Sequence, residues 1–540
     1  MSYTSLNFIL FVCLVAAVYF LFPKKQYQWT VLLAASYAFY LIASYRLALF
    51  LLLTTATTYY AAIRIEDIAL AGKAELKAHK KDWDKETKKA YKEQLKSRKK
   101  KVMLTALVLN LGILAFLKYY NFFAGSLNDL LGAWKLRFSV PTLRLLLPLG
   151  ISFYTFQSVG YVVDVYWDKT PAERNLGKFA LFVSFFPQIV QGPISFYDQL
   201  GHQLYEPHSF DFTRCKHGLE LILWGFFKKL VIADRAVIAI NTVVADYTAF
   251  GGTTLTFTVL LYALQLYADF SGGIDISRGV AQILGIDLVK NFNRPYFATS
   301  INDYWRRWHI TLGAWMKEYV FYPLALSKRF IETGKKIKAT AFGQTEFGAH
   351  VAKVLPTAFA SLVVFFLVGV WHGANWKYVA FGLWNGGIIM LSTLLEPKFE
   401  KLTEKLKLNA KSLGFRVFQM LRTFLVVLVG YVFDVAPDLT QSMRTFALAL
   451  TDQNLSAGAA EIATLGLGTA DYLLLILCTV FLFLVSLVQE RNSDTTIRQM
   501  LDEKHFAVRY VFLLTGLLAL LVFGIYGPGF DPTAFVYMQF

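Results

Sequence analysis

A series of apolar runs, each near the length of a membrane-spanning helix, constrains this chain more than any other feature. Crossing about 30 Å of hydrocarbon takes roughly 20 helical residues, and backbone amides in lipid must find hydrogen-bond partners within their own segment. Helices are therefore the expected spanning elements. The clearest runs are Ser5–Phe22, Trp29–Ala43, Leu47–Ile63, Val354–Val370, Tyr472–Leu487 and Val508–Ile525.

The composition agrees with a membrane protein. Charged residues make up only 17% of the 540-residue chain, whereas a soluble globular chain carries about 25%. Counting the apolar runs predicts an all-α polytopic membrane protein with roughly eleven to thirteen transmembrane helices. The first run has no basic leader and is long for a signal peptide, so we expect it to be retained as a span.

The net charge of +17 is concentrated in loops. Basic residues next to span ends mark the cytoplasmic side, which places the N-terminus outside. No recognition motif accompanies the charge, so we expect the lipid bilayer with its anionic headgroups as partner and no nucleic acid. The basic stretches are Lys24–Lys25, Lys73–Lys101, Lys328–Lys338 and Lys398–Arg416.

The Lys73–Lys101 stretch mixes lysine with acidic residues at helical spacings. We expect a solvated cytoplasmic helix or hairpin that sets the topology, with docking of a partner as the alternative. The three cysteines, Cys13, Cys215 and Cys478, lie far apart and predict neither a disulfide framework nor a zinc site.

The middle of the chain differs from its ends. From Leu147 to Gly387 the apolar runs are broken by Gly, Pro, Asn, charged residues and Trp, and broken helices at membrane depth are tolerated only when buried in protein or lining a wet cavity. We therefore divide the chain into N-terminal spans with a basic cytoplasmic loop at 73–101, a functional core, and C-terminal spans. These parts are residues 1–140, 141–395 and 396–540.

His372 follows a long apolar run in VVFFLVGVWHGANW. A titratable side chain at such depth is costly and indicates a functional site, and Gly369 and Gly373 leave room for a ligand or a second helix to approach the backbone. The alternative is a buried neutral histidine that bonds a neighbouring helix.

His309 lies in NDYWRRWHITLGAWMKEY. Read as one helix, this segment places Trp305, Trp308 and His309 on one face. An interfacial helix is the alternative, because aromatic rings and arginine suit a headgroup belt. No acidic neighbour stands at metal-ligand spacing, so no metal is expected here.

Two charged segments that precede His309 remain open in role. Asp269, at the end of an apolar run, has Asp275 and Arg278 within a turn or two, which fits a functional site, a structural ion pair or a helix cap. Further on, Asn291, Asn293, Arg294 and Pro295 stop a helix and hold the next segment. Arg294 could pair with a carboxylate or a phosphate.

Imidazole is suited to take a proton from a hydroxyl near neutral pH, so the two histidines could serve hydroxyl acylation. Composition alone does not select that reaction. A Gly-x-Ser-x-Gly elbow, a P-loop and a Rossmann fingerprint are all missing from the sequence, which argues against those chemistries.

The middle segments resemble the membrane-bound O-acyltransferase family, in the branch of the alginate O-acetylation and teichoic acid D-alanylation membrane subunits. The resemblance covers most of the chain, and the Arg-Trp-His and Trp-His-Gly blocks are its most specific part. The sequence of this chain departs from the pattern of that branch at Ser195–Phe196 and at Asp434. The matching segments are PLGISFYTFQSVGYVVDVY, SFFPQIVQGPI, YADFSGGIDISRGVAQILGI, NFNRPYFATSINDYWRRWHITL, GVWHGANW and the terminal FDPTAFVYMQF.

The resemblance implies a catalytic role for His372, which deprotonates or orients the accepting hydroxyl, and for His309, which assists, for instance by polarising the acyl carbonyl. It also implies a donor thioester reached from the cytoplasm and an acceptor reached from outside, which meet in a central tunnel surrounded by broken or re-entrant helices. The residues expected to line this tunnel or bind substrate are Trp305, Trp308, Trp371, Asn375, Asp269, Arg294 and Gln191.

The favoured function is therefore O-acetyl transfer to a cell-surface polysaccharide in a bacterial cell membrane. The resemblance implies acetyl-coenzyme A as donor, no bound cofactor, and an extracytoplasmic acyltransferase partner. The alternative within the family is D-alanyl transfer to teichoic acid from a carrier-protein thioester. A transporter and a non-catalytic scaffold are the alternatives from other classes; broken helices also occur in transporters, but no inverted repeat is visible.

Overall fold

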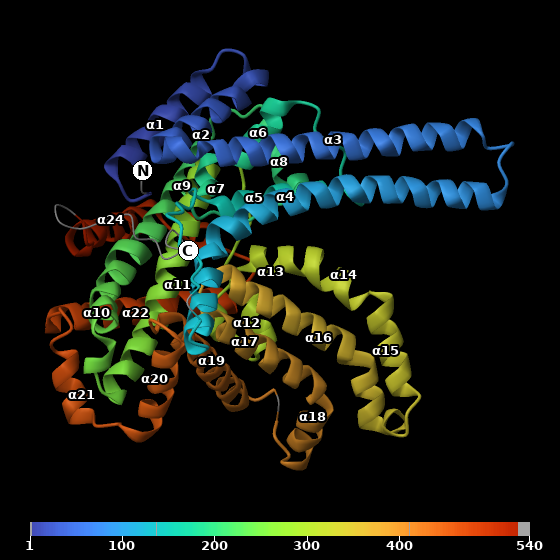
Figure 1. Ribbon diagram of the computed structural model, residues 1–540. Helices are drawn as coiled ribbons and strands as arrows, with labels where there is room; N and C mark the ends of the chain where they lie inside the picture. The colour runs from blue at the N-terminus through green and yellow to red at the C-terminus, as the bar shows by residue number, and fades with distance from the viewer. Residues whose placement is uncertain (1–2, 137, 410, 527–540) are drawn as a thin grey trace. The chain divides into compact units, whose positions relative to one another are not determined.

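Helices make up most of the part of the chain that the structure describes. The structure, a computed structural model, describes residues 3–136, 138–409 and 411–526, so the terminal FDPTAFVYMQF segment lies outside its described part. Within those ranges the chain folds into 24 α-helices joined by turns and longer loops, and no strand is present (Figure 1). The all-helical class predicted from the sequence is confirmed.

Among the residues that the structure describes, six helical segments are long and apolar enough to cross a membrane, or seven if α17 and α18, which meet at a bend of 62°, form one broken span. The prediction of eleven to thirteen spans also counts shorter or charge-bearing helices, such as the 16-residue α1 and the aspartate-containing α11. The six are Lys25–Ala78 (α2 and α3), Lys85–Ala133 (α4), Glu346–His372 (α16), Leu413–Val435 (α19), Thr469–Arg491 (α22) and Phe506–Phe523 (α24).

Large apolar side chains cover the outside of these helices. Leu6 on α1 is 69% exposed, Leu477 on α22 is 66% exposed and Val522 on α24 is 69% exposed. A water-soluble monomer rarely exposes contiguous apolar surface on this scale. The exposed faces therefore fit a hydrocarbon solvent.

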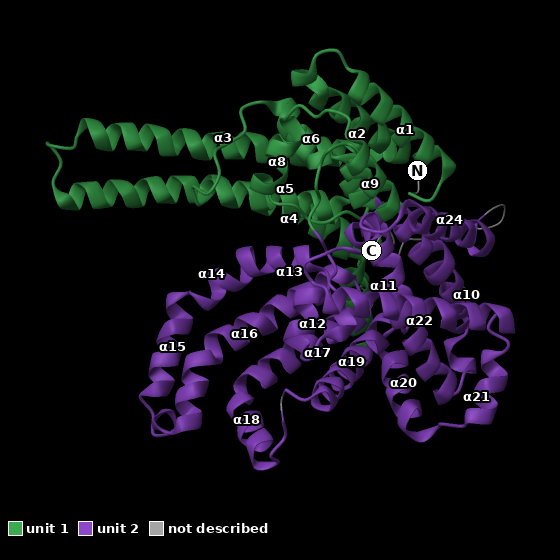
Figure 2. Cartoon of the chain, turned by 180° about the vertical axis from the view of Figure 1, so that it is seen from behind, with its two compact units in different colours: residues 1–222, 277–289 green, residues 223–276, 290–540 purple. Residues whose placement is uncertain are grey.

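The described chain divides into two compact units (Figure 2). Unit 1 comprises residues 1–222 and 277–289, and unit 2 comprises residues 223–276 and 290–540. Two helices, α9 (Phe212–Phe226) and α11 (Gly252–Ile283), begin in one unit and continue in the other. The three-part division expected from the sequence stays a prediction.

Unit 1 contains the N-terminal helices. Besides its parts of α9 and α11, its helices are α1 (Leu6–Leu21), α2 (Gln28–Ser44), α3 (Ala48–Ala78), α4 (Lys85–Ala133), α5 (Ile151–Tyr166), α6 (Leu176–Ser184), α7 (Phe186–Ile189) and α8 (Tyr197–Tyr205).

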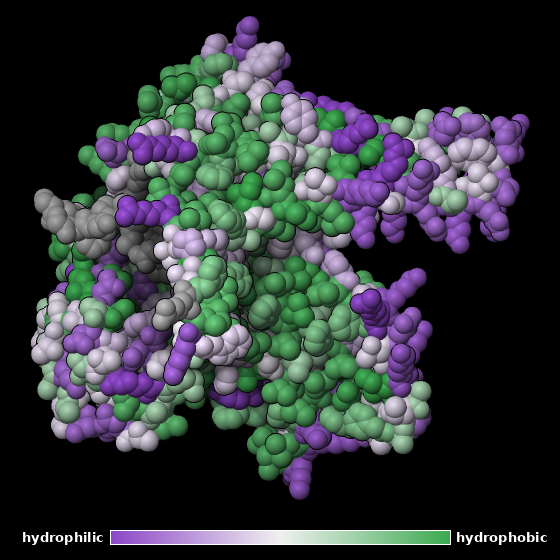
Figure 3. All heavy atoms as spheres, in the orientation of Figure 1, coloured by the Kyte–Doolittle hydropathy of each residue, from purple (hydrophilic) through white to green (hydrophobic). Residues whose placement is uncertain are grey.

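Within unit 1, α3 and α4 form the hairpin predicted for the Lys73–Lys101 stretch, and Figure 3 shows hydrophilic residues over its far half. Asp84 starts α4 by accepting a hydrogen bond from the backbone N–H of Thr87 at 2.8 Å, as an N-cap does. Near the other end of the charged part, Lys99 pairs with Asp168 at 3.0 Å. The hairpin prediction is confirmed.

Unit 2 contains the helices that carry both predicted catalytic histidines. They are α10 (Asp234–Ala245), α12 (Ile301–Arg307), α13 (Ile310–Met316), α14 (Tyr322–Ala325), α15 (Lys328–Lys338), α16 (Glu346–His372), α17 (Trp376–Leu394), α18 (Glu396–Lys405), α19 (Leu413–Val435), α20 (Leu439–Thr451), α21 (Leu455–Ile462), α22 (Thr469–Arg491), α23 (Ile497–Asp502) and α24 (Phe506–Phe523).

The helices α16 and α17 pack closely because glycine faces glycine where they meet. A Cβ atom added at Gly369 would lie 2.3 Å from the backbone oxygen of Tyr378 and 2.8 Å from the Cα of Gly382. Neither backbone atom can move without separating the two helices. The sequence predicts that Gly369 leaves room for a ligand or for a second helix, and in the structure the second helix occupies that room.

We expect Gly369→Ala to destabilise the protein by about 1–3 kcal/mol, the usual cost of overpacking a close contact. A lower midpoint of thermal unfolding in detergent is the measurement. Gly387→Ala on α17 is the matched control, because nothing lies within 4 Å of its added Cβ and alanine favours a helix over glycine. Equal midpoints for the two variants would contradict the role given to Gly369.

Candidate active site

The segment that carries His309 is a broken helix rather than the continuous one read from the sequence. Helix α12 ends at Arg307, Trp308 is extended, and α13 begins at Ile310. His309 between them is left-handed, with φ 45° and ψ 53°, a conformation that non-glycine residues adopt infrequently. The break turns the His309 side chain in a direction that a continuous helix would not give it.

Asn291 stabilises this break. Its backbone oxygen accepts from the N–H of Ile310 at 3.0 Å, and its side-chain Oδ1 accepts from the N–H and the hydroxyl of Thr311 at 3.0 and 2.9 Å. The same Oδ1 lies 3.3 Å from Nδ1 of His309. Asn291 is 1% exposed, so a single buried side chain ties the residues on the C-terminal side of the break together.

His372 is the last residue of α16 and is also buried. Its ring packs on two aromatic rings of α17, with centroid distances of 6.2 Å to Tyr378 and 5.1 Å to Phe381. A Cβ atom at the following Gly373 would lie 2.2 Å from the Tyr378 ring. The glycine lets this ring reach the end of α16, beside His372.

The two histidines meet at Trp371. The centroid of the Trp371 ring lies 5.8 Å from that of His309 and 5.3 Å from that of His372. On its other side His309 meets the edge of Phe270, on α11, at 4.8 Å. Two imidazoles 63 residues apart in the sequence thus share one buried aromatic wall, an arrangement able to move a proton to or from a bound hydroxyl.

The predicted tunnel tryptophans belong to the same wall. Trp305 donates from Nε1 to Oδ1 of Asn385 on α17 at 3.2 Å, and Trp308 stacks on Tyr304 at 5.8 Å. Trp308 is 3% exposed. Burial of Trp308 and His309 within the protein argues against the alternative of an interfacial helix, whose rings would face the lipid headgroups.

Asn375 and Asp269 have structural partners. Asn375 caps α17, since its Oδ1 accepts from the N–H of Lys377 at 3.0 Å. Asp269, fully buried on α11, pairs with Lys229 at 2.5 Å. Lys229 also pairs with Asp234 at 2.9 Å. The alternative of a structural ion pair for Asp269 is thereby favoured, although the lysine partner was not foreseen.

Lys228, next to Lys229, pairs with Asp275 at 2.7 Å and donates to Ser271 at 2.9 Å. Both lysines lie in the π-helical turn Phe227–Ala233. Such turns interrupt an α-helix at considerable cost and often occur at functional sites. We call Lys228, Lys229, Asp234, Asp269 and Asp275 the lysine–aspartate network.

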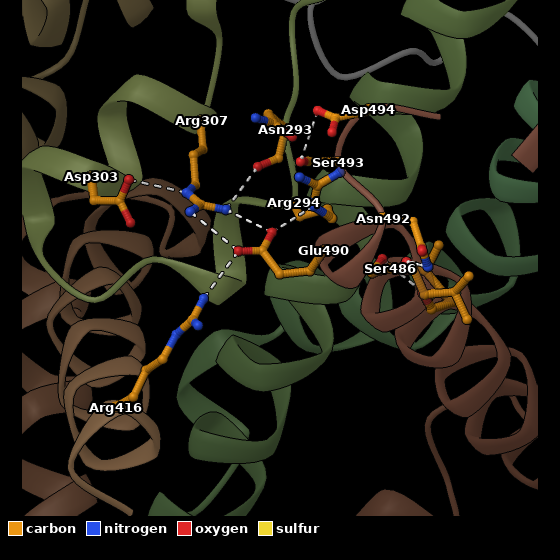
Figure 4. Close-up of polar contacts among 12 residues, drawn as sticks. Asn293, Arg294, Asp303, Arg307, Arg416, Ser486, Glu490, Asn492, Ser493 and Asp494 are labelled. Atoms are coloured by element: carbon orange, nitrogen blue, oxygen red, sulfur yellow. Dashed lines mark hydrogen bonds and ion pairs between the residues drawn. The ribbon is translucent and has the colours of Figure 1, made fainter. Parts of the chain in front are cut away.

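Arg294 pairs with a carboxylate, which answers one question left open by the sequence. Its Nε lies 2.7 Å from Oε2 of Glu490, near the end of α22 (Figure 4). Arg307 reaches the same carboxylate at 3.1 Å and Arg416 reaches it at 3.2 Å. Arg307 also binds Asp303 at 3.0 Å. These five residues, the Glu490 cluster, tie α12 and the segment before it to α19 and α22.

We expect Glu490→Gln to lower stability by about 1–3 kcal/mol, because three guanidinium groups lose a shared and largely buried counter-charge. The measurement is the midpoint of thermal unfolding. Glu346→Gln is the control, since Glu346 pairs with Lys401 at 2.6 Å on an exposed surface where an ion pair contributes little. An unchanged midpoint for Glu490→Gln would show that the cluster does not stabilise unit 2.

Gln191 belongs to unit 1 and is fully buried. Its side-chain amide forms no hydrogen bond with any described residue. Its role in binding substrate stays a prediction. Among the described residues, no group of three or more His, Cys, Asp or Glu side chains could hold a metal ion.

Residues 172–343 match MBOAT, the membrane-bound O-acyltransferase family. A probable alginate O-acetylase of Pseudomonas syringae pv. tomato is 31% identical over 396 residues, which are 73% of this chain and 69% of that protein. The chain belongs to the membrane-bound O-acyltransferase family. It is a multi-pass membrane protein.

Three other proteins similar to this family member are named as acyl-transferring or alanyl-transferring enzymes. A probable alginate O-acetylase of Azotobacter vinelandii is 33% identical over 345 residues, covering 63% of this chain and 61% of that protein. The chain thus spans about three fifths of the length of that relative. A peptidoglycan O-acetyltransferase of Helicobacter pylori is 31% identical over 66% of each chain. A teichoic acid D-alanyltransferase of Bacillus subtilis is 28% identical over 54% of this chain.

The sequence analysis assigned no role to Lys228, Lys229 or Glu490 of this family member. Lys228 and Lys229 stand in an apolar run, LELILWGFFKKLVIA, so their cost in a membrane could have identified them. Glu490 lies near the end of an ordinary span, and the sequence predicts that Asn291 stops a helix and holds the next segment but does not predict its contact with His309. Their contacts join segments distant in the sequence, and no local pattern indicates those contacts.

Proposed function

We propose that the chain is an O-acyltransferase of a bacterial cell membrane that moves an acetyl group from a cytoplasmic thioester to a hydroxyl of a cell-surface polysaccharide or a partner protein. The observation that carries the proposal is the meeting of His309 and His372 at the Trp371 ring. Two buried imidazoles at one position suit proton transfer from a hydroxyl.

The reaction needs one proton to move. The hydroxyl oxygen attacks the thioester carbonyl carbon, the carbon–sulfur bond breaks, and the hydroxyl proton passes through an imidazole to the leaving thiolate. The products are an O-ester and a free thiol. In this proposal His372 deprotonates or orients the hydroxyl and His309 assists. The aromatic wall of Trp305, Trp308 and Trp371 excludes water, which would otherwise hydrolyse the thioester.

The names of the relatives guide the choice of donor and acceptor. Alginate O-acetylases and a peptidoglycan O-acetyltransferase favour acetyl transfer to a polysaccharide. We propose acetyl-coenzyme A as the donor and an extracytoplasmic acyltransferase as the partner that completes delivery. The basic α3–α4 hairpin suits an anionic donor or carrier protein on the cytoplasmic side.

The test is acyl transfer by the purified protein in nanodiscs with radiolabelled acetyl-coenzyme A and alginate or peptidoglycan fragments as acceptors. Release of free coenzyme A with label on the acceptor is the expected result. Turnover with a D-alanyl carrier-protein thioester alone would select the teichoic acid reaction suggested by the more distant relative. Solute uptake into vesicles without any acylation would select a transporter and overturn the proposal.

A further inference from the structure

We propose that Asn291 fixes the proton of His309 on Nδ1, so that His309 enters the reaction as a proton acceptor at Nε2. The inference rests on the proposed function for its catalytic consequence. The tautomer itself follows from hydrogen bonds alone and can be measured in protein that shows no catalytic activity. Asn291 is accordingly a positioning residue.

The first step identifies the amide atom of Asn291 that faces His309. An asparagine side chain can be turned by 180° with little change in shape, so its oxygen is assigned from its partners. The backbone N–H of Thr311 points at this atom from 3.0 Å. A backbone N–H only donates, so the atom must be an acceptor, and the only acceptor on the amide is Oδ1.

The second step assigns the proton of His309. Oδ1 of Asn291 cannot donate, so a hydrogen bond to Nδ1 of His309 at 3.3 Å requires the hydrogen on Nδ1. The neutral ring then carries its lone pair on Nε2. The protonated ring keeps the same Nδ1–H and adds a second proton on Nε2. In either state only Nε2 gains or loses a proton.

The third step concerns precision. His309 occupies a left-handed conformation, which costs about 1–2 kcal/mol for a residue with a Cβ atom. The bonds from Ile310 and Thr311 to Asn291 hold the two residues that follow His309 and so oppose its relaxation to a helix. Arg294 and Arg307, close to Asn291 and His309 in the chain, both bind Glu490. The ring direction and the tautomer are thus set by the same short segment.

The consequence is a division of roles. Neutral His309 can accept a hydrogen bond or a proton at Nε2, but it cannot donate one from there to an acyl carbonyl. Polarisation of the carbonyl, the assistance implied by the family resemblance, would require the opposite tautomer or a protonated ring. The geometry therefore assigns His309 to the proton-accepting side of the reaction.

The first measurement is nitrogen NMR of the protein labelled with ¹⁵N-histidine in lipid. The chain has eight histidines, and the two His309 signals are identified by their loss in His309→Gln. At neutral pH we expect the wild type to show a protonated Nδ1 and an unprotonated Nε2. A protonated Nε2 with a bare Nδ1 would overturn the proposal, whatever the protein catalyses.

The second measurement compares three variants. Asn291→Leu removes the acceptor and is expected to mix the tautomers and lower kcat about 10²-fold, with little change in KM for the donor. Asn291→Asp keeps an oxygen at the same place, so it is expected to retain the Nδ1–H tautomer and recover most of kcat. Its added carboxylate favours the protonated ring, so the acidic limb of its pH–rate profile is expected to move to higher pH.

Thr311→Val is the matched control, because it removes the hydroxyl bond to Oδ1 of Asn291 and leaves the His309 contact. It is expected to keep the tautomer and nearly all of kcat. Equal losses in Thr311→Val and Asn291→Leu, or an unshifted pH profile in Asn291→Asp, would reduce Asn291 to a structural residue. If no variant and no wild type transfers an acyl group, the proposed function fails while the NMR result still decides the tautomer.

Discussion

His372→Ala is expected to lower the rate of acyl transfer by about 10²–10⁴-fold, the usual contribution of a positioned general acid or base. The imidazole is buried at the end of α16, between Trp371 and the rings of Tyr378 and Phe381. Alanine leaves the glycine contacts of α16 with α17 unchanged. The loss should therefore appear mainly in kcat, well beyond the fall in the midpoint of thermal unfolding that the cavity left by the imidazole causes, with both measured on protein in nanodiscs.

His350→Ala is the matched control for His372→Ala. His350 is on the same helix and binds the backbone oxygen of Thr393 at 3.0 Å, but it lies about 33 Å away along the helix axis at 1.5 Å per residue. It is expected to transfer acyl groups at nearly the wild-type rate. Full activity in His372→Ala would leave family membership intact and remove His372 from the mechanism.

The fold class could be predicted because hydropathy and charge are local properties of the chain. The run before His372 became the span α16, and the Lys73–Lys101 stretch became the end of α3, a turn and the start of α4. Asn293, Arg294 and Pro295 keep their segment out of an α-helix, since Arg294 is left-handed and a 3₁₀ turn begins at Pro295, but the helix they were predicted to stop, α11, already ends at Ile283. Each of these features depends on a few adjacent residues.

The arrangement of the site depends on contacts that no short segment contains. Continuous helical periodicity through Trp305, Trp308 and His309 gave no sign of the break at His309, because Asn291, which stabilises it, lies 18 residues earlier. The sequence could not decide whether Arg294 binds a carboxylate or a phosphate, because its partner Glu490 is 196 residues away in the sequence. The resemblance to the family's motifs identified the two histidines as candidate catalytic residues. Their shared contact with Trp371 is seen only in the folded structure.

Lys229→Met is expected to destabilise unit 2 by about 3–5 kcal/mol, the cost of leaving buried charge without its partner. Lys229 is 1% exposed and pairs with Asp269, which is 0% exposed, and with Asp234, which is 3% exposed. Methionine keeps most of the volume, so the loss reflects charge rather than a cavity. The measurement is the midpoint of thermal unfolding in detergent, with the amount of folded protein after purification as a second readout.

The double variant Lys229→Met with Asp269→Leu tests whether the effect arises from unpaired charge. It removes the most buried carboxylate together with its cation, so it is expected to recover part of the lost stability, which a purely steric effect of methionine would not allow. Lys401→Met is the control, because Lys401 and Glu346 form an exposed pair and their loss should change little. A wild-type midpoint for Lys229→Met would mean that the network does not stabilise the fold. Its two lysines and three aspartates would then need a role in the chemistry, as intramembrane charges usually have.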